Sequence, residues 1–504
     1  MTTRAPLAPP TVVAPEDLRA AVTPLLDSGA RLALVAGHHD PDGIRIVHTY
    51  LTPAQPPHEV ETTIADGAEG VPSLAPFSFP IGRFEREVRD LYGVTPIGHP
   101  LPRRLIRHGH WPTGYYPMRH DAPAHPEFEE DTGSFPFLQV TGAGVYEIPV
   151  GPVHAGLIEP GHFRFSVVGE TILRMKARLW FLHRGIERLF EGRLPQEGIE
   201  LAERISGDTA VGHGLAYTLA VEQALGIDVE PEDVRSRSLL LELERLHNHV
   251  ADIGAIVNDV GYGIIHAQAQ IQRERLLRHH RHLTGHRLLR GAVAPGATVL
   301  RRPPDLDLVA DVAHETAQIV DLALGHGTVL DRLTGTSKLP LEDARRIGVL
   351  GYVAKASGLE VDARRDHPLG ADLPGFEPVV EVGGDVLARF LVRAREVQQS
   401  AGLIAALATD AHHPSRANGA RQARVPRDTS PLRRSGRGLG VVEAWRGTLV
   451  HRVEIRDGRL TRCKVVDPSF FNWPALPVAL ADTIVPDFPL TNKSFNQSYA
   501  GNDL

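Results

Sequence analysis

The chain has 504 residues, one cysteine, and a formal net charge of −7 from 54 Lys and Arg against 61 Asp and Glu. With 42% hydrophobic residues it can bury a large core and hold two or three domains. The single cysteine, Cys463, excludes a disulfide framework and any metal or iron-sulfur centre held by several cysteines of this chain. The mild acidity is spread along the sequence, which argues against binding nucleic acid through a basic face.

The sequence carries no signal for a membrane span or for secretion. No stretch approaches the ~20 consecutive apolar residues of a membrane-spanning helix, and residues 1–10 lack the apolar segment of a secretory signal. We therefore expect a cytoplasmic protein, or one docked peripherally on the cytoplasmic side of a membrane through partner subunits.

The N-terminal region predicts a small α/β domain. Residues 83–92 have the pattern of a short helix, and alternating apolar residues predict strands at 31–36, 44–51 and 59–64. The cluster of His38, His39, Asp40 and Asp42 has the residue types of a metal site. However, Asp-Pro-Asp-Gly between two apolar runs is typical of a hairpin turn, which is the stronger interpretation.

The second region predicts a mainly helical bundle with peripheral strands. Segment 121–144 is rich in proline, glycine and acidic residues and predicts a linker between domains at 1–120 and 145–504. Apolar periodicity predicts helices at 172–190, 239–257, 308–333, 344–357 and 386–407. Alternation predicts strands at 146–150, 163–168, 447–455 and 460–466. The expected fold class is therefore α+β.

Three sequence features favour structural interpretations. The glycine strings Gly142-Ala-Gly144 and Gly436-Arg-Gly438-Leu-Gly440 lack the strand–helix context of a nucleotide site, so we expect loops. The basic run Arg278-His-His-Arg-His282 ends a helical pattern, and a solvated helix terminus is favoured there over an anion or metal site.

Three polar strings are candidates for function. The first, 151–165, places His154, Glu159, His162 and Arg164 in a loop between two strands, where either a functional cluster or a structural network is open. The second, 203–214, contains Asp208 and His213 at the start of a helical run. The third, 467–474, reads Asp-Pro-Ser-Phe-Phe-Asn-Trp-Pro.

In this order, the strings resemble the large subunit of membrane-bound nickel-iron hydrogenases of the formate-hydrogenlyase and hydrogenase-4 type, and the related quinone-site (49-kDa) subunit of respiratory complex I. Segments 241–249, 285–287, 356–367 and 443–447 support the resemblance. Segment 84–93, with Gly98-His-Pro, resembles the 30-kDa α/β subunit of complex I, which is fused ahead of the large subunit in this hydrogenase group. The resemblance implies a hydrogenase large-subunit or complex I 49-kDa-like fold for the second domain.

The departures from the family bear on function. Aligned on the two Cys-x-x-Cys pairs that hold nickel and iron in hydrogenases, the four positions here are Ser206, Thr209, Ser469 and Asn472. Hydroxyl and amide groups cannot replace soft, anionic thiolates. The family's histidine near the maturation cleavage site falls at Ala475, so processing is not expected. The resemblance therefore implies no metal in this chain, and an active nickel-iron hydrogenase is disfavoured.

The resemblance also implies roles for the polar residues that remain. His154 matches the histidine near the quinone headgroup of complex I, Glu159 a proton-relaying acid, and Arg446 the arginine above the metal centre. The tyrosine that complex I uses near the quinone falls at Gly207. We name His154, Glu159, Asp208 and Arg446 as candidate catalytic residues. The pocket-lining candidates are His154, His162, Arg164 and His213.

Two functions from different classes remain open. In the first, the chain is the redox-site subunit of a complex I-like or hydrogenase-4-like assembly, in which a partner's iron-sulfur cluster exchanges electrons with an organic acceptor, a quinone being one candidate. In the second, it is a non-catalytic scaffold that holds the iron-sulfur subunit against the membrane arm. Both imply an iron-sulfur small subunit resembling the 20-kDa subunit of complex I, membrane subunits of the antiporter-like type, and no cofactor bound by this chain. We expect segments 151–164, 204–213 and 467–474 to line the partner interface.

Overall fold

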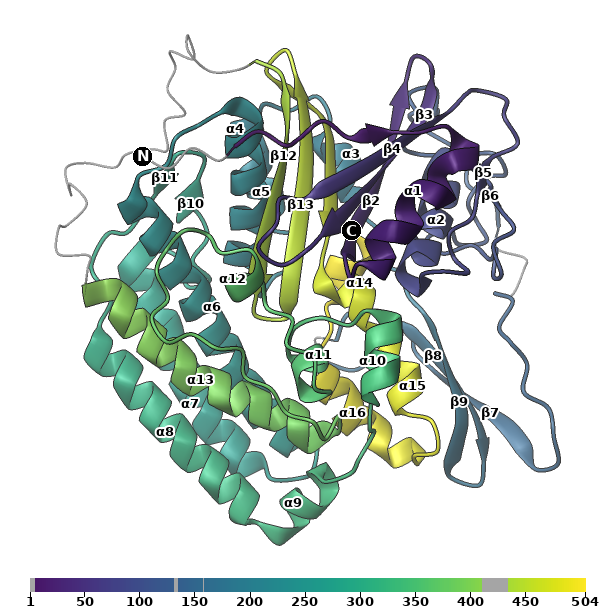
Figure 1. The fold of residues 1–504 in the computed structure, drawn as a ribbon. Helices are drawn as coiled ribbons and strands as arrows, with labels where there is room; N and C mark the ends of the chain where they lie inside the picture. The colour runs from purple at the N-terminus through teal and green to yellow at the C-terminus, as the bar shows by residue number, and fades with distance from the viewer. Residues whose placement is uncertain (1–4, 131–134, 157, 410–433) are drawn as a thin grey trace.

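The computed structural model describes residues 5–130, 135–156, 158–409 and 434–504. Its N-terminal region contains a four-stranded sheet in the order β1-β4-β3-β2, on which the helices α1 and α2 pack (Figure 1). Its elements are β1 (Thr11–Val12), a 3₁₀ turn (Pro15–Asp17), α1 (Leu18–Asp27), β2 (Arg31–Asp40), β3 (Gly43–Leu51), β4 (His58–Ile64), β5 (Val71–Pro72), α2 (Phe79–Tyr92) and β6 (Pro96–Ile97). The predicted strands, helix and hairpin turn are confirmed, since β2 ends at Asp40 and β3 begins at Gly43.

A three-stranded antiparallel sheet, in the order β7-β8-β9, projects from the body of the molecule (Figure 1). It consists of β7 (Val145–Val150), β8 (His162–Val168) and β9 (Thr171–Arg178). The predicted helix over 172–190 is wrong for its first part, and only α3 (Ile186–Phe190) is helical there. Pairing with β8 along its length overrides the helical pattern of this short apolar run.

The helical bundle of the second region is confirmed. Its long helices α6, α7, α8 and α13 pack side by side around a core of Leu, Ile and Val side chains (Figure 1). Its helices are α4 (Pro195–Ala202), α5 (Ala210–Leu225), α6 (Pro231–Asn258), α7 (Gly263–Thr284), α8 (Leu306–Gly325), α9 (Gly327–Leu333), α10 (Leu341–Ile347), α11 (Gly351–Ala356), α12 (Ala363–Asp366) and α13 (Val386–Thr409), with a small hairpin of β10 (Val293–Ala294) and β11 (Ala297–Thr298). The basic run 278–282 lies in the last turns of α7, as predicted, but only Arg278, Arg281 and His282 are exposed, while His279 and His280 are buried.

A second three-stranded sheet, β12-β13-β14, forms the centre of the molecule. It contains β12 (Gly436–Ala444), β13 (Gly447–Arg456) and β14 (Arg459–Val466). The prediction of a loop at 436–440 is therefore wrong. The glycines are needed because α5 lies directly on β12: a Cβ atom at Gly440 would be 1.8 Å from the carbonyl oxygen of Ala216, and one at Gly438 would be 1.9 Å from that of Ala220.

The chain then forms short helices: α14 (Pro468–Asn472), α15 (Ala475–Ala479), a 3₁₀ turn (Val485–Asp487), α16 (Phe488–Phe495) and α17 (Tyr499–Asp503). Segment 467–474 is almost entirely buried within the chain. The expectation that it lines a partner interface is therefore wrong, because α2 and α17 already cover it: the rings of Phe84 and Phe470 stack at 4.5 Å, and Trp473 Nε1 donates to the carbonyl oxygen of Ser498.

Buried and partly buried ion pairs connect the N-terminal sheet to the central sheet. Arg452 Nε lies 2.6 Å from Glu59 Oε1, and Arg45 Nη2 lies 2.9 Å from Glu454 Oε2. The described parts of 121–144 contain no helix or strand, while the domain boundary placed there stays a prediction. None of the helices in the described ranges has both the length and the apolarity needed to cross a bilayer.

Candidate functional site

The centre of the candidate site is an ion pair between the α4–α5 turn and the β12–β13 turn. Arg446 Nη1 and Nη2 each lie 2.7 Å from one carboxylate oxygen of Asp208, so the pair is bidentate. Arg446 is 3% exposed, whereas the Asp208 side chain is 38% exposed. The pair therefore closes a buried polar cluster at a point that reaches the surface of the chain.

Two hydroxyl groups complete the coordination of the carboxylate. Ser206 Oγ and Thr209 Oγ1 donate to Oδ1 of Asp208 at 2.9 and 3.0 Å. Burial opposes ionisation of Asp208, but the charge and hydrogen bonds of Arg446 outweigh it and hold its pKa well below the usual range. Asp208 is thus an ionised, fully hydrogen-bonded carboxylate at neutral pH, which suits it to fix Arg446 rather than to relay protons.

The turn is held in place by α6. Glu244 accepts hydrogen bonds from the backbone N–H groups of Val211 and Gly212, in the first turn of α5, at 2.7 and 2.9 Å. These N–H groups have no partner within their own helix. Asn248 Nδ2 also donates to the carbonyl oxygen of Asp208 at 2.9 Å. The position of Asp208 is therefore set by side chains one turn apart on α6.

The segment before α17 supplies a residue that sequence reasoning missed. Ser498 Oγ lies 2.8 Å from Ser206 Oγ, and the backbone N–H of Ser498 donates to Ser469 Oγ at 2.9 Å. Asn472 instead bonds through its side chain to the backbone of Leu350, at 2.8 and 3.2 Å.

This geometry corrects the assignment of the second ligand pair. Ser498 and Gly501 have the same three-residue spacing as Ser206 and Thr209, and a Cβ atom at Gly501 would lie 3.1 Å from Ser498 Oγ. We infer that Ser498 and Gly501, rather than Ser469 and Asn472, occupy the positions of the second pair. The signal in the sequence was this spacing within the polar tail.

Behind the ion pair lies a buried chain of hydrogen-bonding groups. His213 Nε2 is 3.1 Å from Asp467 Oδ2, and His213 Nδ1 is 3.1 Å from His451 Nε2. The hydrogen bond from His213 helps to lower the pKa of Asp467 against the effect of burial, so His213 donates to a carboxylate. The other ring nitrogen of His213 faces His451, whose Nδ1 faces Cys463 Sγ at 3.9 Å. His451 stays neutral, because burial holds its pKa well below the usual value.

Two histidine side chains bond to backbone carbonyl groups at the ends of the loop between β7 and β8. His154 Nε2 lies 2.8 Å from the carbonyl oxygen of Gly161, and His162 Nδ1 lies 3.1 Å from that of Gly151. Arg164 extends along the projecting sheet, where it pairs with Glu147 at 3.4 Å. Glu159 accepts a hydrogen bond from Ala500 N at 3.1 Å, beside Ser498.

Among the predicted site residues, the structure thus brings Asp208 and Arg446 into direct contact. His213 bonds to Asp467, whose charge acts on Arg446 without a direct contact. Glu159 reaches the same region through the backbone of Ala500. His154, His162 and Arg164 instead bond to Gly161, Gly151 and Glu147, and His162 and Arg164 also pack on Phe137. Whether this loop is a functional cluster or a structural network stays open.

The residues present do not fit a nickel-iron centre. Ser206, Thr209 and Ser498 offer neutral hydroxyl groups that hydrogen-bond to one another or to Asp208, and Gly501 offers no side chain. These are poor ligands for metals that need thiolates. In the described ranges, no group of three or more His, Cys, Asp or Glu side chains is arranged to hold a metal ion.

Comparisons with known proteins agree with this architecture. Residues 259–503 match the family described as respiratory-chain NADH dehydrogenase, 49 Kd subunit, and residues 11–127 match the 30 Kd subunit. Residues 184–253 match nickel-dependent hydrogenase. The matches follow the order of the fused 30-kDa and 49-kDa regions along the chain.

Three individual proteins are similar over most of the chain. Formate hydrogenlyase subunit 5 of Escherichia coli K12 is 33% identical, over 83% of this chain and 74% of that protein. Hydrogenase-4 component G of the same organism is 32% identical, over 83% and 73%. A chain of the membrane-bound sulfane sulfur reductase, an archaeal respiratory membrane complex, superposes with a TM-score of 0.64 at 25% identity, covering 72% of this chain and 99% of that one.

Proposed function

The chain belongs to the family of formate hydrogenlyase subunit 5 and hydrogenase-4 component G, and we propose that it is the redox-site subunit of its membrane-associated complex. In this role a partner's iron-sulfur cluster passes electrons to an organic acceptor, a quinone being one candidate, with no nickel-iron centre in this chain. Reduction of a quinone to a quinol takes up two electrons and two protons. The site must therefore stabilise negative charge and receive protons.

The observation that carries this proposal is the position of the Asp208–Arg446 pair. A buried charge pair is costly unless it is well hydrogen-bonded, and this one lies where the family's metal ligands converge while one edge reaches the surface. The guanidinium of Arg446 could stabilise negative charge on an acceptor that approaches from that edge.

The partner surface follows from the exposed side chains around the loop 151–161. Val153 is 85% exposed and Ile158 is 52% exposed, although both are apolar. We propose that these side chains contact the iron-sulfur subunit or a membrane subunit, which would place the chain peripherally on the cytoplasmic side of the membrane. Large exposed apolar side chains that lie close together favour such an interface.

A second candidate function is the non-catalytic scaffold. The hydrogen bonds of Asp208 favour the scaffold function, because both of its carboxylate oxygens already accept from Arg446, Ser206 or Thr209. A site that is complete without an acceptor has no need of one.

Replacement of Arg446 by lysine separates the two functions. Lysine keeps the charge but cannot donate to both carboxylate oxygens and to Asn496 O, as Arg446 does. If the site is working, the purified complex should assemble while electron transfer from the iron-sulfur partner to a soluble quinone falls by ~10-fold or more. Arg278→Lys, at a 73% exposed position on α7, is the matched control. Unchanged turnover in an intact Arg446→Lys complex would favour the scaffold.

A further inference from the structure

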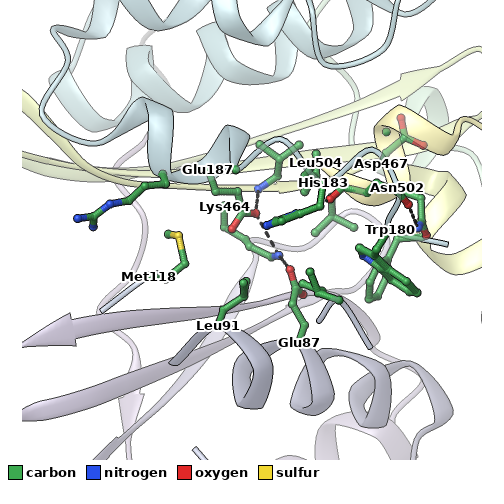
Figure 2. Close-up of a pocket in the computed structure, with 18 of the residues that line it drawn as sticks. Glu87, Leu91, Met118, Trp180, His183, Glu187, Lys464, Asp467, Asn502 and Leu504 are labelled. Carbon is green, nitrogen blue, oxygen red and sulfur yellow. Dashed lines mark hydrogen bonds and ion pairs between the residues drawn. The ribbon is translucent and has the colours of Figure 1, made fainter. Parts of the chain in front are cut away.

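A pocket lies where the N-terminal region meets the end of the chain (Figure 2). Helix α2 forms one wall, and β14 with residues 501–504 forms another. Most of the lining is apolar, including Leu91, Met118 and Trp180, but Glu87, Lys464 and Asp503 also line it. Figure 2 shows Lys464 between Glu87 and Glu187, with its Nζ atom 2.5 Å from Glu87 Oε1 and 3.1 Å from Glu187 Oε1.

Two buried acceptors in this lining have no hydrogen-bond partner among the described residues. They are Glu87 Oε2 and Asn502 Oδ1, on residues that are 6% and 2% exposed. A buried acceptor left without a hydrogen bond is destabilising. Because both residues line the same pocket, a water molecule inside it can donate to these two acceptors.

The pocket borders the candidate site. Its lining includes Asp467 and Gly501 as well as the exposed Arg188. The backbone N–H of Gly501 donates to Ser498 Oγ at 2.8 Å, and Asp467 Oδ2 lies 3.1 Å from His213 Nε2. Two lining residues are therefore in direct contact with the hydroxyl cluster and with the buried histidine.

We propose that this pocket holds water and delivers protons to the redox site, with Glu87 and Asp503 as the proton-carrying groups. The inference rests on the proposed function, since reduction of a quinone-type acceptor takes two electrons from the partner's iron-sulfur clusters and two protons from solvent. It assigns the N-terminal region a part in the reaction, because Glu87 belongs to α2.

The environment of the two carboxyl groups suits this task. Burial raises the pKa of Asp503 to about 6, and burial also raises the pKa of Glu87 although Lys464 opposes it. A group whose pKa lies near the working pH can both take up and release a proton. Asp503 is held by Leu182 N at 3.0 Å and by Asn502 Nδ2 at 2.8 Å, so its position is fixed.

The first test uses the complete complex with a short-chain ubiquinone as acceptor. Glu87→Gln keeps an oxygen for Lys464, and Asp503→Asn removes the second carrier. We expect each variant to lower turnover at pH 7, together by ~10²-fold, with a larger solvent deuterium isotope effect. Glu85→Gln is the matched control, because Glu85 is also buried on α2 but bonds to Ser73 and Leu74 outside this pocket. Wild-type rates and isotope effects in both variants would overturn the proposal, while a slow Arg446→Lys complex would leave the proposed function standing.

The second test needs no turnover. In the intact chain, infrared spectra should contain a protonated carboxyl band that disappears as the pH rises through about 6 and that Asp503→Asn lacks. If water fills the pocket, this band should shift promptly when the protein is transferred to D₂O. A band that stays unshifted for hours would show a dry pocket and would overturn the proposal even if the proposed function holds.

Discussion

Ser206 and Ser498 are 292 residues apart in the sequence, yet their hydroxyl oxygens lie 2.8 Å from each other. The contact joins the α4–α5 turn to the segment before α17, the two segments that carry residue pairs with three-residue spacing. It adjoins the Asp208–Arg446 pair, because Ser206 Oγ also donates to Asp208, in a chain that is a complex I-like and hydrogenase-4-like subunit of a membrane-associated oxidoreductase.

We expect the chain to bind no nickel. Hydroxyl groups at Ser206, Thr209 and Ser498 remain protonated at neutral pH and are hard, weak ligands for nickel. Elemental analysis of protein that is co-expressed with a complete set of hydrogenase maturation factors measures this directly. About one nickel atom per chain would contradict the prediction.

The reassignment of the second pair can be tested by cross-linking. A double variant, Ser206→Cys with Ser498→Cys, should form a disulfide under mild oxidation, because the two Oγ atoms are 2.8 Å apart and a disulfide needs Cβ atoms within ~4.5 Å. Ser206→Cys with Asn472→Cys is the control, since Asn472 points to Leu350. Mass spectrometry of the non-reduced protein reports the bond. Equal yields in the two variants would refute the reassignment.

Asp208→Asn should destabilise the chain in a pH-dependent way. The substitution leaves the buried Arg446 without its counter-ion, and we expect a loss of about 2 kcal/mol at pH 7, less than for a fully buried pair because Asp208 is 38% exposed. The pKa of Asp208 is lowered in the folded state, so its contribution is present above pH ~4 and is lost as the pH falls toward the folded-state pKa. Thermal unfolding should show a smaller difference in stability between the wild type and Asp208→Asn at pH 3 than at pH 7. The same difference at both pH values would argue against loss of the ion pair as its cause.

Gly440→Ala should disrupt the contact between α5 and β12. The added Cβ atom would lie 1.8 Å from Ala216 O, so the sheet and helix must separate, at a cost of ~3 kcal/mol or more. Gly402→Ala provides the control, because Gly402 lies on an exposed face of α13 with open space around it and should gain ~0.5–1 kcal/mol. Chemical denaturation of both variants measures the two effects. Similar stability of the two variants would contradict the close packing of α5 on β12.

The sequence was sufficient for elements whose pattern is local. The helix α6 and the turn at Asp40–Gly43 could be predicted from the sequence. The apolar period of one helix face determines the first, and the residues of the turn determine the second. Gly438 and Gly440 were misinterpreted as a loop, since the need for glycine arises from Ala216 and Ala220 on another element. Ile172 likewise joins a strand only because β8 lies beside it.

The same distinction applies to the site. Asp208 and Arg446 were identified from motifs, but their bidentate contact spans 238 residues and could not be read from either motif alone. Ser498 lay in a polar tail without a recognisable string. His154 and Arg164 carried the residue types of a functional loop, but their contacts with Gly161 and Glu147 could not be read from the sequence.

The most direct test of the central claim measures nickel content and electron transfer on one preparation of the native membrane complex. A working redox site without a nickel-iron centre predicts reduction of a soluble quinone by the reduced iron-sulfur partner, in a preparation with no nickel bound to this chain. Turnover should fall in the Arg446→Lys complex and stay unchanged in Arg278→Lys. Stoichiometric nickel, or an intact complex that passes no electrons to any acceptor, would contradict the claim.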